Sequence, residues 1–600
     1  MNQKIVALII ARMTSTRLPG KGLKDICGRD LLGHIIDRLR KVKSIDEIVL
    51  ATTNRKEDIP LLEFAKREKI KSFAYDGDKE DVVGRIRKAG EYFSADILVH
   101  ISGDCPLIHP PTIERLIDAL IKNKAEMASI AKKNGKKVIH EGIGVCTLKA
   151  WQKVEENSTK SYQRENLVAC LLDYPHLLKK VEIDDEPIFY ELNHRISVDT
   201  QADLNFMRKV YKRLYKPGEI VDLKEAIKLL KREPKLMEIN SRVRQKKLQD
   251  KSKRILFRMD ANQKIGMGHL IRCLALASEL QERYFCGISF IIKSSNSVTD
   301  MIKERGFKVE ILSKNISKED ELSQIEKFVQ DYGIDRIILD LKDKIANEYI
   351  LKLRKLNIPI ISIDNDSEEA FFADINIFPV AHFIPDRKWE NYKGKLYYGP
   401  EYVILRREFQ KDYPYPNNSI PNILITMGGS DAENLTGKVL SAILPIPDIH
   451  ITIILGKFFA HYNKIRQMIR GRNNIIIYQD VTNMAEIMTK ADLAVTYFGV
   501  TAYELAKMGI PAIVIAHSRE DKLNAERFAE HGTCVSLGYC KEVNKEKICS
   551  VIRKLLSNKE IRKKMSIRGR ELLDGRESER IAKIIINSEE RSIVTTGAQN

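Results

Sequence analysis

Short apolar runs alternate with stretches of helical periodicity through the first hundred residues of the chain. The apolar runs have the length of buried strands, and the stretches between them repeat hydrophobic positions every three or four residues, as amphipathic helices do. The predicted strands are Ile5–Ile10, Glu47–Thr52, Ile70–Tyr75 and Ile97–Ile101, and the helices between them include Leu31–Leu39 and Ile59–Lys69. This alternation predicts an α/β domain with a doubly wound parallel sheet, in which ligands bind at the carboxyl ends of the strands.

The same pattern begins again near Arg254. A strand at Ile255–Phe257 leads into a glycine-rich turn and then into a helix-period run that begins at Leu270. Two later strands, Ile423–Thr426 and Leu493–Thr496, each end in a turn that contains glycine. A chain of 600 residues is too long for one hydrophobic core, so two to four domains are expected.

Charge-rich sequence separates the two patterns. Residues 242–254, RVRQKKLQDKSKR, are typical of a solvated helix that continues into a linker between domains. The predicted organisation is a first domain, a charged linker, the two lobes of a second module, and a polar, disordered tail. The corresponding boundaries are 1–246, 247–253, 254–418, 419–588 and 589–600.

The composition is that of a globular chain without membrane spans. Hydrophobic residues make up 43% of the sequence, and no segment approaches the ~18 uninterrupted apolar residues of a transmembrane helix. The N-terminal apolar run passes into an arginine-rich loop without a small-residue cleavage site, so we interpret it as a strand and not as a signal peptide. The nine cysteines include no Cys-x-x-Cys pair, which argues against a disulfide framework or a zinc site. We therefore expect a cytoplasmic protein.

The formal charge of +19 is compatible with nucleic acid, an anionic membrane surface or small anionic substrates. Much of the excess lies in lysine-rich helical stretches such as 205–254, which contain few aromatic residues and none after Tyr215. This arrangement disfavours nucleic-acid binding.

The loop after the first strand, ARMTSTRLPGK, carries three cations close to small hydroxyl residues. Arg12, Arg17 and Lys21, with Ser15 among the hydroxyls, would form a cradle for a polyphosphate at the end of a parallel strand. The alternative is that each of these cations is ordinary solvated surface.

Two aspartates are candidates for binding a metal in the same domain. Asp104 follows the strand ILVHI in the motif SGDCPL, and Asp199 lies in RISVDT, which we predict to be another strand end before a helix near Asp203. Two carboxylates at strand ends of one sheet would hold Mg²⁺ against a triphosphate. Either aspartate alone would also serve as a helix cap or turn former.

These motifs resemble the cytidylyltransferases that activate acidic sugars, the Kdo and sialic-acid CMP-synthetases, and most closely their spore-coat polysaccharide branch. ARMTSTRLPGK, GDCPL, VDTQAD and DGDKEDVVGR carry the resemblance, which covers about residues 1–246. It implies a GT-A-like nucleotidyltransferase fold, CTP bound by Arg12, Ser15, Arg17 and Lys21, and Mg²⁺ on Asp104 and Asp199, with Arg12 and Lys21 acting in catalysis. An acidic 2-keto sugar would attack CTP to give a CMP-sugar. One departure affects the acceptor side, because the branch often has Arg-Glu-His where this chain has Arg164-Glu165-Asn166.

Candidate residues in the second part also lie at strand-to-helix turns. His269, in KIGMGH, begins a helix whose dipole would favour the neutral imidazole, although a helix cap or packing residue is the plainer interpretation. Glu504, one turn into the helix after Phe498-Gly499-Val500-Thr501, would accept both hydroxyls of a ribose or would simply face solvent. The turn at Gly428–Ser430 suits a diphosphate, and Asn524 is a further polar candidate.

Residues 254–588 resemble the two-lobed GT-B nucleotide-sugar enzymes: the UDP-sugar hydrolase of the pseudaminic acid pathway, its spore-coat relatives and, more distantly, MurG-like glycosyltransferases. RMDANQKIGMGHLIRC, TMGGSDAENLT and FGVTAYELAKMGIPAIVI carry this resemblance. It implies that His269 is the base for attack by water and that no metal is needed. The implied UDP-sugar contacts are Gly266, Gly268, Arg272, Gly428, Gly429, Ser430, Val500, Thr501, Glu504 and Asn524. The hydrolases commonly have Asp-His-Tyr, with the tyrosine in the active site, where this chain has Asp340-Leu341-Lys342-Asp343. The missing tyrosine leaves glycosyl transfer or a different UDP-sugar open, and the plainer interpretation of Asp340 is that it ends a strand.

The combined expectation is a bifunctional enzyme of nonulosonic acid or surface polysaccharide biosynthesis. It would join Mg²⁺-dependent cytidylyl transfer from CTP to hydrolysis of a UDP-amino sugar. Two alternatives stay open: a cytidylyltransferase fused to a GT-B glycosyltransferase, and a non-enzymatic basic protein that binds nucleotide sugars or nucleic acid. No nucleic-acid partner is expected, and a homodimer through the first domain is left open.

Overall fold

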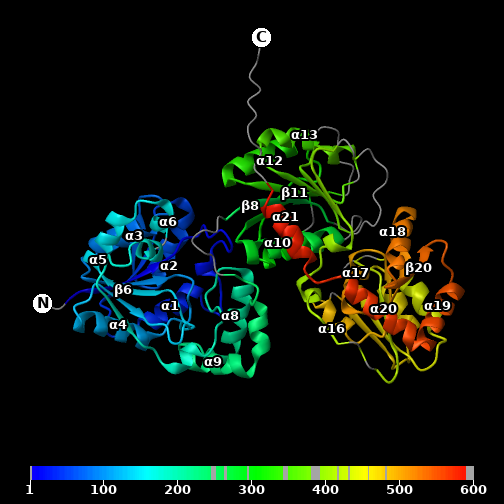
Figure 1. Ribbon diagram of the computed structural model, residues 1–600, viewed down its shortest axis with the longest axis horizontal. Coiled ribbons are helices and arrows are strands. Elements are labelled where there is room, and N and C mark those ends of the chain that lie inside the picture. The colour runs from blue at the N-terminus through cyan, green and yellow to red at the C-terminus, as the bar shows by residue number, and fades with distance from the viewer. Residues whose placement is uncertain are drawn as a thin grey trace, which may run out of the picture. The chain divides into compact units, whose positions relative to one another are not determined.

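The structure is a computed structural model in which the chain forms two compact units, Met1–Lys251 and Ser252–Asn600 (Figure 1). It describes residues 3–165, 167–244, 252–261, 267–293, 296–341, 349–365, 367–379, 389, 392–414, 416, 418–429, 431, 433–456, 459–479, 481 and 483–588. Most of the predicted linker and the whole predicted tail lie outside the described residues.

The first unit is built on one seven-stranded sheet with the order β3-β2-β1-β4-β6-β5-β7. The strands are β1 (Ile5–Ile10), β2 (Glu47–Thr53), β3 (Lys71–Tyr75), β4 (Ile97–Ser102), β5 (Met127–Ile130), β6 (Ile143–Thr147) and β7 (Lys180–Ile183). The predicted strands are confirmed to within one residue at each end, and these four strands pair in parallel as predicted, whereas a further strand does not. β6 runs antiparallel to both β4 and β5. The connection from β5 to β6 contains no helix, and a parallel crossover usually needs one.

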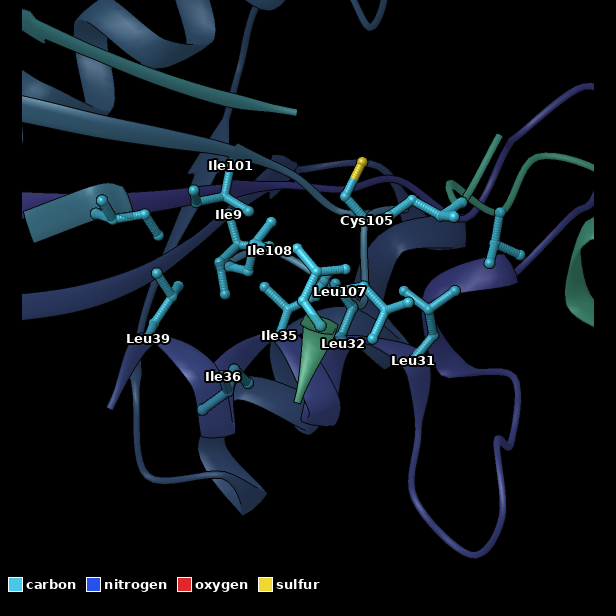
Figure 2. Packing of buried hydrophobic residues seen from close by; sticks show 14 of the residues in the cluster. Ile9, Leu31, Leu32, Ile35, Ile36, Leu39, Ile101, Cys105, Leu107 and Ile108 are labelled. Carbon is cyan, nitrogen blue, oxygen red and sulfur yellow. The ribbon is translucent and has the colours of Figure 1, made fainter. Parts of the chain in front are cut away.

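Helices cover both faces of this sheet. They are α1 (Leu31–Leu39), α2 (Ile59–Arg67), α3 (Val82–Tyr92), α4 (Pro110–Lys122), α5 (Leu148–Asn157), α6 (Ser161–Glu165), α7 (Leu167–Asp173), α8 (Gln201–Leu214) and α9 (Leu223–Arg232). The apolar face of α1 packs on the strands through Leu32, Ile35 and Leu39, beside Ile9 and Ile101 (Figure 2). Leu107 and Ile108 join the same cluster, so its burial also fixes the loop that leaves β4.

The second unit contains two parallel sheets, as expected of a two-lobed Rossmann-like module. The first has the order β10-β9-β8-β11-β12-β13-β14, and the second has the order β17-β16-β15-β18-β19-β20. The first lobe contains β8 (Arg254–Met259), β9 (Gly287–Ile292), β10 (Lys308–Ile311), β11 (Arg336–Asp340), β12 (Ile360–Ile363), β13 (Ile375–Phe378) and β14 (Lys395–Tyr398). The second contains β15 (Asn422–Thr426), β16 (His450–Leu455), β17 (Ile475–Gln479), β18 (Leu493–Tyr497), β19 (Ala512–Ala516) and β20 (Cys534–Tyr539).

The helices of the second unit also divide between the two lobes, and one helix at the end of the chain is the exception. Those after the strands of the first sheet are α10 (Gly268–Tyr284), α11 (Asn296–Glu304), α12 (Lys318–Tyr332) and α13 (Tyr349–Leu353). Those of the second lobe are α14 (Leu435–Ile443), α15 (Tyr462–Met468), α16 (Met484–Met488), α17 (Val500–Met508), α18 (Arg519–Glu530), α19 (Lys545–Ser557) and α20 (Lys559–Leu572). The last helix, α21 (Glu577–Ile586), returns to the first lobe and packs beside α10 (Figure 1). Buried Arg336 donates from Nε to the Ile585 carbonyl at 2.9 Å, which ties the end of the described chain to β11.

Among the described residues, none of the helices combines the length and the apolar character that crossing a membrane requires.

A buried histidine makes the stability of the first unit sensitive to pH. His109 precedes α4, contacts the Thr112 hydroxyl through Nδ1 at 2.9 Å and packs against Phe189. Burial, with a smaller contribution from His140, lowers the pKa of His109 to about 4, whereas Asp185 and Glu186 oppose the shift.

We predict that this unit loses stability as the pH falls from 7 to 5. Below about pH 6.5 the unfolded chain binds a proton that folded His109 does not accept until about pH 4, so protonation favours unfolding throughout this interval. His109→Asn should reduce the fall in unfolding temperature between pH 7 and pH 5, measured by calorimetry. The same change at exposed His176 is the control, and an equal fall in both variants would contradict the prediction.

Candidate active sites

The loop that follows β1 is held in place at both ends. The Met13 amide donates to Asp58 Oδ1 at 2.7 Å, and the Gly20 amide donates to the Met13 carbonyl at 2.9 Å. Gly20 has φ of +66°, which favours glycine, and Leu18 is fully buried. The loop therefore presents Arg12, Arg17 and Lys21 from a fixed backbone, with half-buried Ser15 between them.

Close contact between β1 and β4 determines where Asp104 lies. The Gly103 amide donates to the Ile10 carbonyl at 3.0 Å, and a Cβ at Gly103 would lie 2.7 Å from that oxygen. Glycine is therefore needed at this position, and Asp104 directly follows it at the carboxyl edge of the sheet. The prediction of a strand-end aspartate at Asp104 agrees with this geometry.

The prediction that Asp199 also ends a strand is wrong. Residues 193–200 form an extended segment outside the sheet, and the Val198 amide donates to the Asp104 carbonyl at 2.8 Å. Thr200 then caps α8 through a reciprocal capping box with Asp203. One hydrogen bond to the β4 loop, and not a strand ladder, brings Asp199 to Asp104.

Lys21 joins the two aspartates. Its Nζ lies 2.7 Å from Asp104 Oδ2 and 2.6 Å from Asp199 Oδ1, and Arg17 Nη2 lies 2.8 Å from the other oxygen of Asp199. Arg195 also pairs with Asp199. Burial opposes ionisation of Asp199, but Lys21, Arg17 and Arg195 outweigh it and hold the pKa of this carboxyl well below its usual range. Burial opposes the charge on Lys21 as well, and the two carboxylates raise the pKa of its amine above the ordinary value.

The donor set fits the Mg²⁺ that the resemblance implies. Two carboxylate oxygens already lie within hydrogen-bond distance of one cationic nitrogen, so they can share a small cation. No group of three or more His, Cys, Asp or Glu side chains suited to a metal occurs among the described residues. Mg²⁺ commonly binds in this way, with one or two carboxylates completed by phosphate oxygens and water.

Arg164 does not contact this cluster in the structure. It pairs with Asp81 and with Glu155, the latter at 3.1 Å, and Asp81 also accepts a hydrogen bond from the Tyr75 hydroxyl at 2.9 Å. Asn166, where the sequence departs from the branch, lies outside the described residues.

In the second unit, His269 lies in the first turn of α10 and pairs with Asp340. His269 Nδ1 is 2.5 Å from Asp340 Oδ1, so the ring donates its Nδ1–H to the carboxylate and its proton-accepting nitrogen is Nε2. This arrangement orients the imidazole as required for a general base.

Asp340 is a functional candidate that the sequence analysis left as the end of a strand. It does end β11, but its buried carboxylate also accepts from Arg272 Nε at 2.7 Å and from Arg272 Nη2 at 2.6 Å. Burial opposes its ionisation, yet Arg272 and His269 hold the pKa of Asp340 below its usual range. A charged residue closing the apolar run RIILD was the available signal. Lys342 and Asp343 lie outside the described residues.

A cavity of about 280 Å³ lies between the two sheets of this unit, beside the start of α10. Seven predicted contact residues line it: Gly268, Arg272, Gly428, Gly429, Val500, Thr501 and Glu504. Val500 and Thr501 begin α17, so the positive end of that helix dipole faces the cavity, which favours a phosphate. Asn524 lies on α18 and is not among the described residues that line the cavity, while Gly266 and Ser430 lie outside the described residues.

Two of the glycines that line the cavity are required, one for its backbone angle and one for a close contact between backbone segments. Gly428 has φ of +74°, and no atom lies within 4 Å of a Cβ placed there. A Cβ at Gly456 would lie 2.4 Å from the Gly429 carbonyl oxygen. The turn at 428–429 therefore packs directly on the end of β16 and leaves its other side open to a ligand.

Glu504 is buried, so the interpretation that it faces solvent is wrong. Its two oxygens accept from Arg406 Nε at 2.8 Å and from Arg406 Nη2 at 3.0 Å. Arg406 also pairs with Glu408 at 3.2 Å, lies over the Phe409 ring and lines the cavity. Arg406 was not among the predicted site residues, because its partner Glu504 lies almost a hundred residues away in the sequence.

Comparison with known proteins agrees with the division of the chain into two units. Residues 6–250 match the cytidylyltransferase family, and residues 422–578 match the glycosyltransferase family 28 C-terminal domain. Two relatives are the uncharacterized proteins MJ1062 and MJ1063 of Methanocaldococcus jannaschii. MJ1062 is 34% identical over 43% of this chain and 54% of its own length, so the chain spans about half of that relative. MJ1063 is 32% identical over 40% of this chain and 97% of its own length.

A third relative matches more than half of this chain. The spore coat polysaccharide biosynthesis protein SpsG of Bacillus subtilis is 26% identical over 56% of this chain and 98% of its own length. The chain thus belongs to the cytidylyltransferase family through residues 6–250, and its residues 422–578 are similar to the glycosyltransferase family 28 C-terminal domain.

Proposed function

We propose that the first unit transfers the cytidylyl group of CTP to a hydroxyl of an acidic 2-keto sugar with the help of Mg²⁺. The observation that carries this proposal is the position of Lys21 between Asp104 and Asp199, with Arg17 beside them. The loop after β1, the segment after β4 and the segment before α8 thus bring together the opposite charges that a phosphate-transfer site would need.

The protein's own residues would bind and orient the reactants. Arg12, Arg17 and Lys21 would pair with the triphosphate, with Ser15 as a hydroxyl donor, and Asp104 and Asp199 would hold the metal. When bound, Mg²⁺ would neutralise charge that develops on the leaving pyrophosphate. The sugar hydroxyl attacks the α-phosphorus, its proton leaves with the solvent, and the bond to pyrophosphate breaks.

For the second unit we propose that UDP is released from an amino-sugar nucleotide by attack at the anomeric carbon. His269, oriented by Asp340, would take a proton from the attacking water through Nε2, and the dipole of α17 would favour the diphosphate. Glu504 would receive the ribose hydroxyls, beside Arg406.

Glycosyl transfer is the second candidate, favoured by the match to the glycosyltransferase family 28 C-terminal domain. The same base would then take the proton of an acceptor sugar hydroxyl instead of water. Either reaction fits a role of the two units in nonulosonic acid or surface polysaccharide synthesis.

The first unit should bind CTP more tightly with Mg²⁺ than without it. At about 100 times its dissociation constant, CTP would stabilise the fold by ~2.7 kcal/mol, which is measurable as a rise in unfolding temperature. Asp104→Asn should abolish the part of this rise that depends on Mg²⁺, since it removes a ligand oxygen's charge. Asp96→Asn, at the opposite end of β4, is the control. An equal rise with and without Mg²⁺ in the parent protein would count against a metal-bridged site.

The second unit should release UDP from UDP-amino sugars without an acceptor. His269→Ala should lower the rate by on the order of 10²-fold or more, as loss of a general base does. Asp340→Asn should cause a smaller loss, because it keeps an oxygen acceptor but not the charge. Asp364→Asn, which alters the more exposed partner of Arg272, is the matched control. Release only after a sugar acceptor is added would establish transfer in place of hydrolysis.

A further inference from the structure

Arg85 is a buried arginine for which the structure shows little compensation. It lies on the inner face of α3 and is 1% exposed. Its Nη2 donates to the Lys79 carbonyl at 2.6 Å, while its Nε is buried without a hydrogen-bond partner among the described residues. Buried guanidinium groups are normally paired with a carboxylate, so this one has capacity for an anion.

A second guanidinium converges on the same carbonyl oxygen. Arg12 Nη1 lies 3.2 Å from the Lys79 oxygen and 2.5 Å from Glu80 Oε2. Burial, together with the neighbouring Arg12, lowers the pKa of Arg85 from its ordinary value. The two like charges therefore repel each other, Arg85 from a buried position and Arg12 from a partly exposed one, and an anion placed between them would relieve that repulsion.

Two nearby carboxylates, Asp58 and Glu80, do not supply a firmly held counter-charge for Arg85. Asp58 is buried, but its oxygens accept from the Met13 amide and from the amide and hydroxyl of Thr53. Glu80 pairs with Arg12, yet its side chain is 44% exposed. It is thus a weakly held internal counter-ion.

We propose that Arg85 and Arg12 together form an anion site for the polyphosphate of the nucleotide, and that Glu80 occupies this site in the ligand-free chain. The inference rests on the proposed nucleotide site of the first unit. It adds Arg85, from a different element, to the cations of the 11–21 loop.

The local backbone allows Glu80 to leave without unfolding. The Glu80 amide donates to Asp78 Oδ1 at 2.9 Å, the Asp81 amide donates to the Asp78 carbonyl at 3.0 Å, and Asp81 caps α3 through Gly84. Only the exposed carboxylate of Glu80 has to rotate away. Phosphate oxygens can then accept from both guanidinium groups, a geometry that arginine favours.

The test compares three variants by calorimetric titration with CTP, CMP and inorganic pyrophosphate, each with Mg²⁺. Arg85→Met should weaken binding of CTP and pyrophosphate by about tenfold, the usual effect of losing one charge-assisted hydrogen bond, and should affect CMP less. Glu80→Gln should tighten both polyphosphates several-fold, because the internal competitor is lost. Arg87→Met is the matched control, since it removes the same charge from α3 where the guanidinium pairs with Glu91 and Glu155.

The outcomes separate this inference from the proposed function. If the parent protein binds CTP and both Arg85→Met and Glu80→Gln bind it as the parent does, the Arg85 site is wrong and the nucleotide site stands. If pyrophosphate binds in an Arg85-dependent way but CTP does not bind, the anion site stands and cytidylyl transfer is wrong. If neither ligand binds the parent, both are overturned. Should Arg85→Met fail to fold, Glu80→Gln decides alone, and unchanged affinity overturns the inference.

Discussion

Carboxylates that are partly or fully withdrawn from solvent are the groups on which both candidate sites depend. An ionised carboxylate taken out of water costs several kcal/mol unless cations and hydrogen bonds replace the solvent. Asp340 meets this requirement through Arg272 and His269 of α10, and Asp199 meets it through Lys21, Arg17 and Arg195. In each case the cost is offset by side chains from another segment, so charge neutralisation also fixes the position of the candidate catalytic groups.

The same requirement explains why so many site residues are paired with one another in the ligand-free chain. Lys21 is held by two aspartates, and Glu504 is held by Arg406 at both oxygens. On the proposed function, a nucleotide would therefore replace these internal ion-pair partners and would not meet unpaired charges. Its affinity is the difference between two sets of ion pairs, which makes binding selective for ligands that place charge where the internal partner did.

Hydrophobic periodicity was enough to predict the first four strands and the helices named between them. The contacts between distant segments could not be predicted in this way. The helix Leu31–Leu39 is confirmed residue for residue. Its apolar residues all pack in the same core cluster, so their spacing in the sequence directly reflects the helix. The direction of β6 depends on a connection without a helix, which periodicity does not report. The motif identified Asp199, but its predicted place at a strand end was wrong. Alternating apolar residues such as Ile196 and Val198 occur before an aspartate both at strand ends and in loops. Arg406 and Asp340 acquire their significance only from partners about 70 to 100 residues away.

The geometry of His269 and Asp340 bears on the choice between hydrolysis and transfer. A base oriented through Nδ1 can take a proton from water or from a sugar hydroxyl, so the dyad serves both reactions equally. The choice depends on what reaches the anomeric carbon once the nucleotide is in place. The cavity of about 280 Å³ is near the lower end of the range for ligand pockets, so it would hold part of a nucleotide sugar and leave the remainder toward its opening. If the proposed reaction takes place here, the surface around that opening, and not the His269–Asp340 pair, would determine whether an acceptor or water completes it.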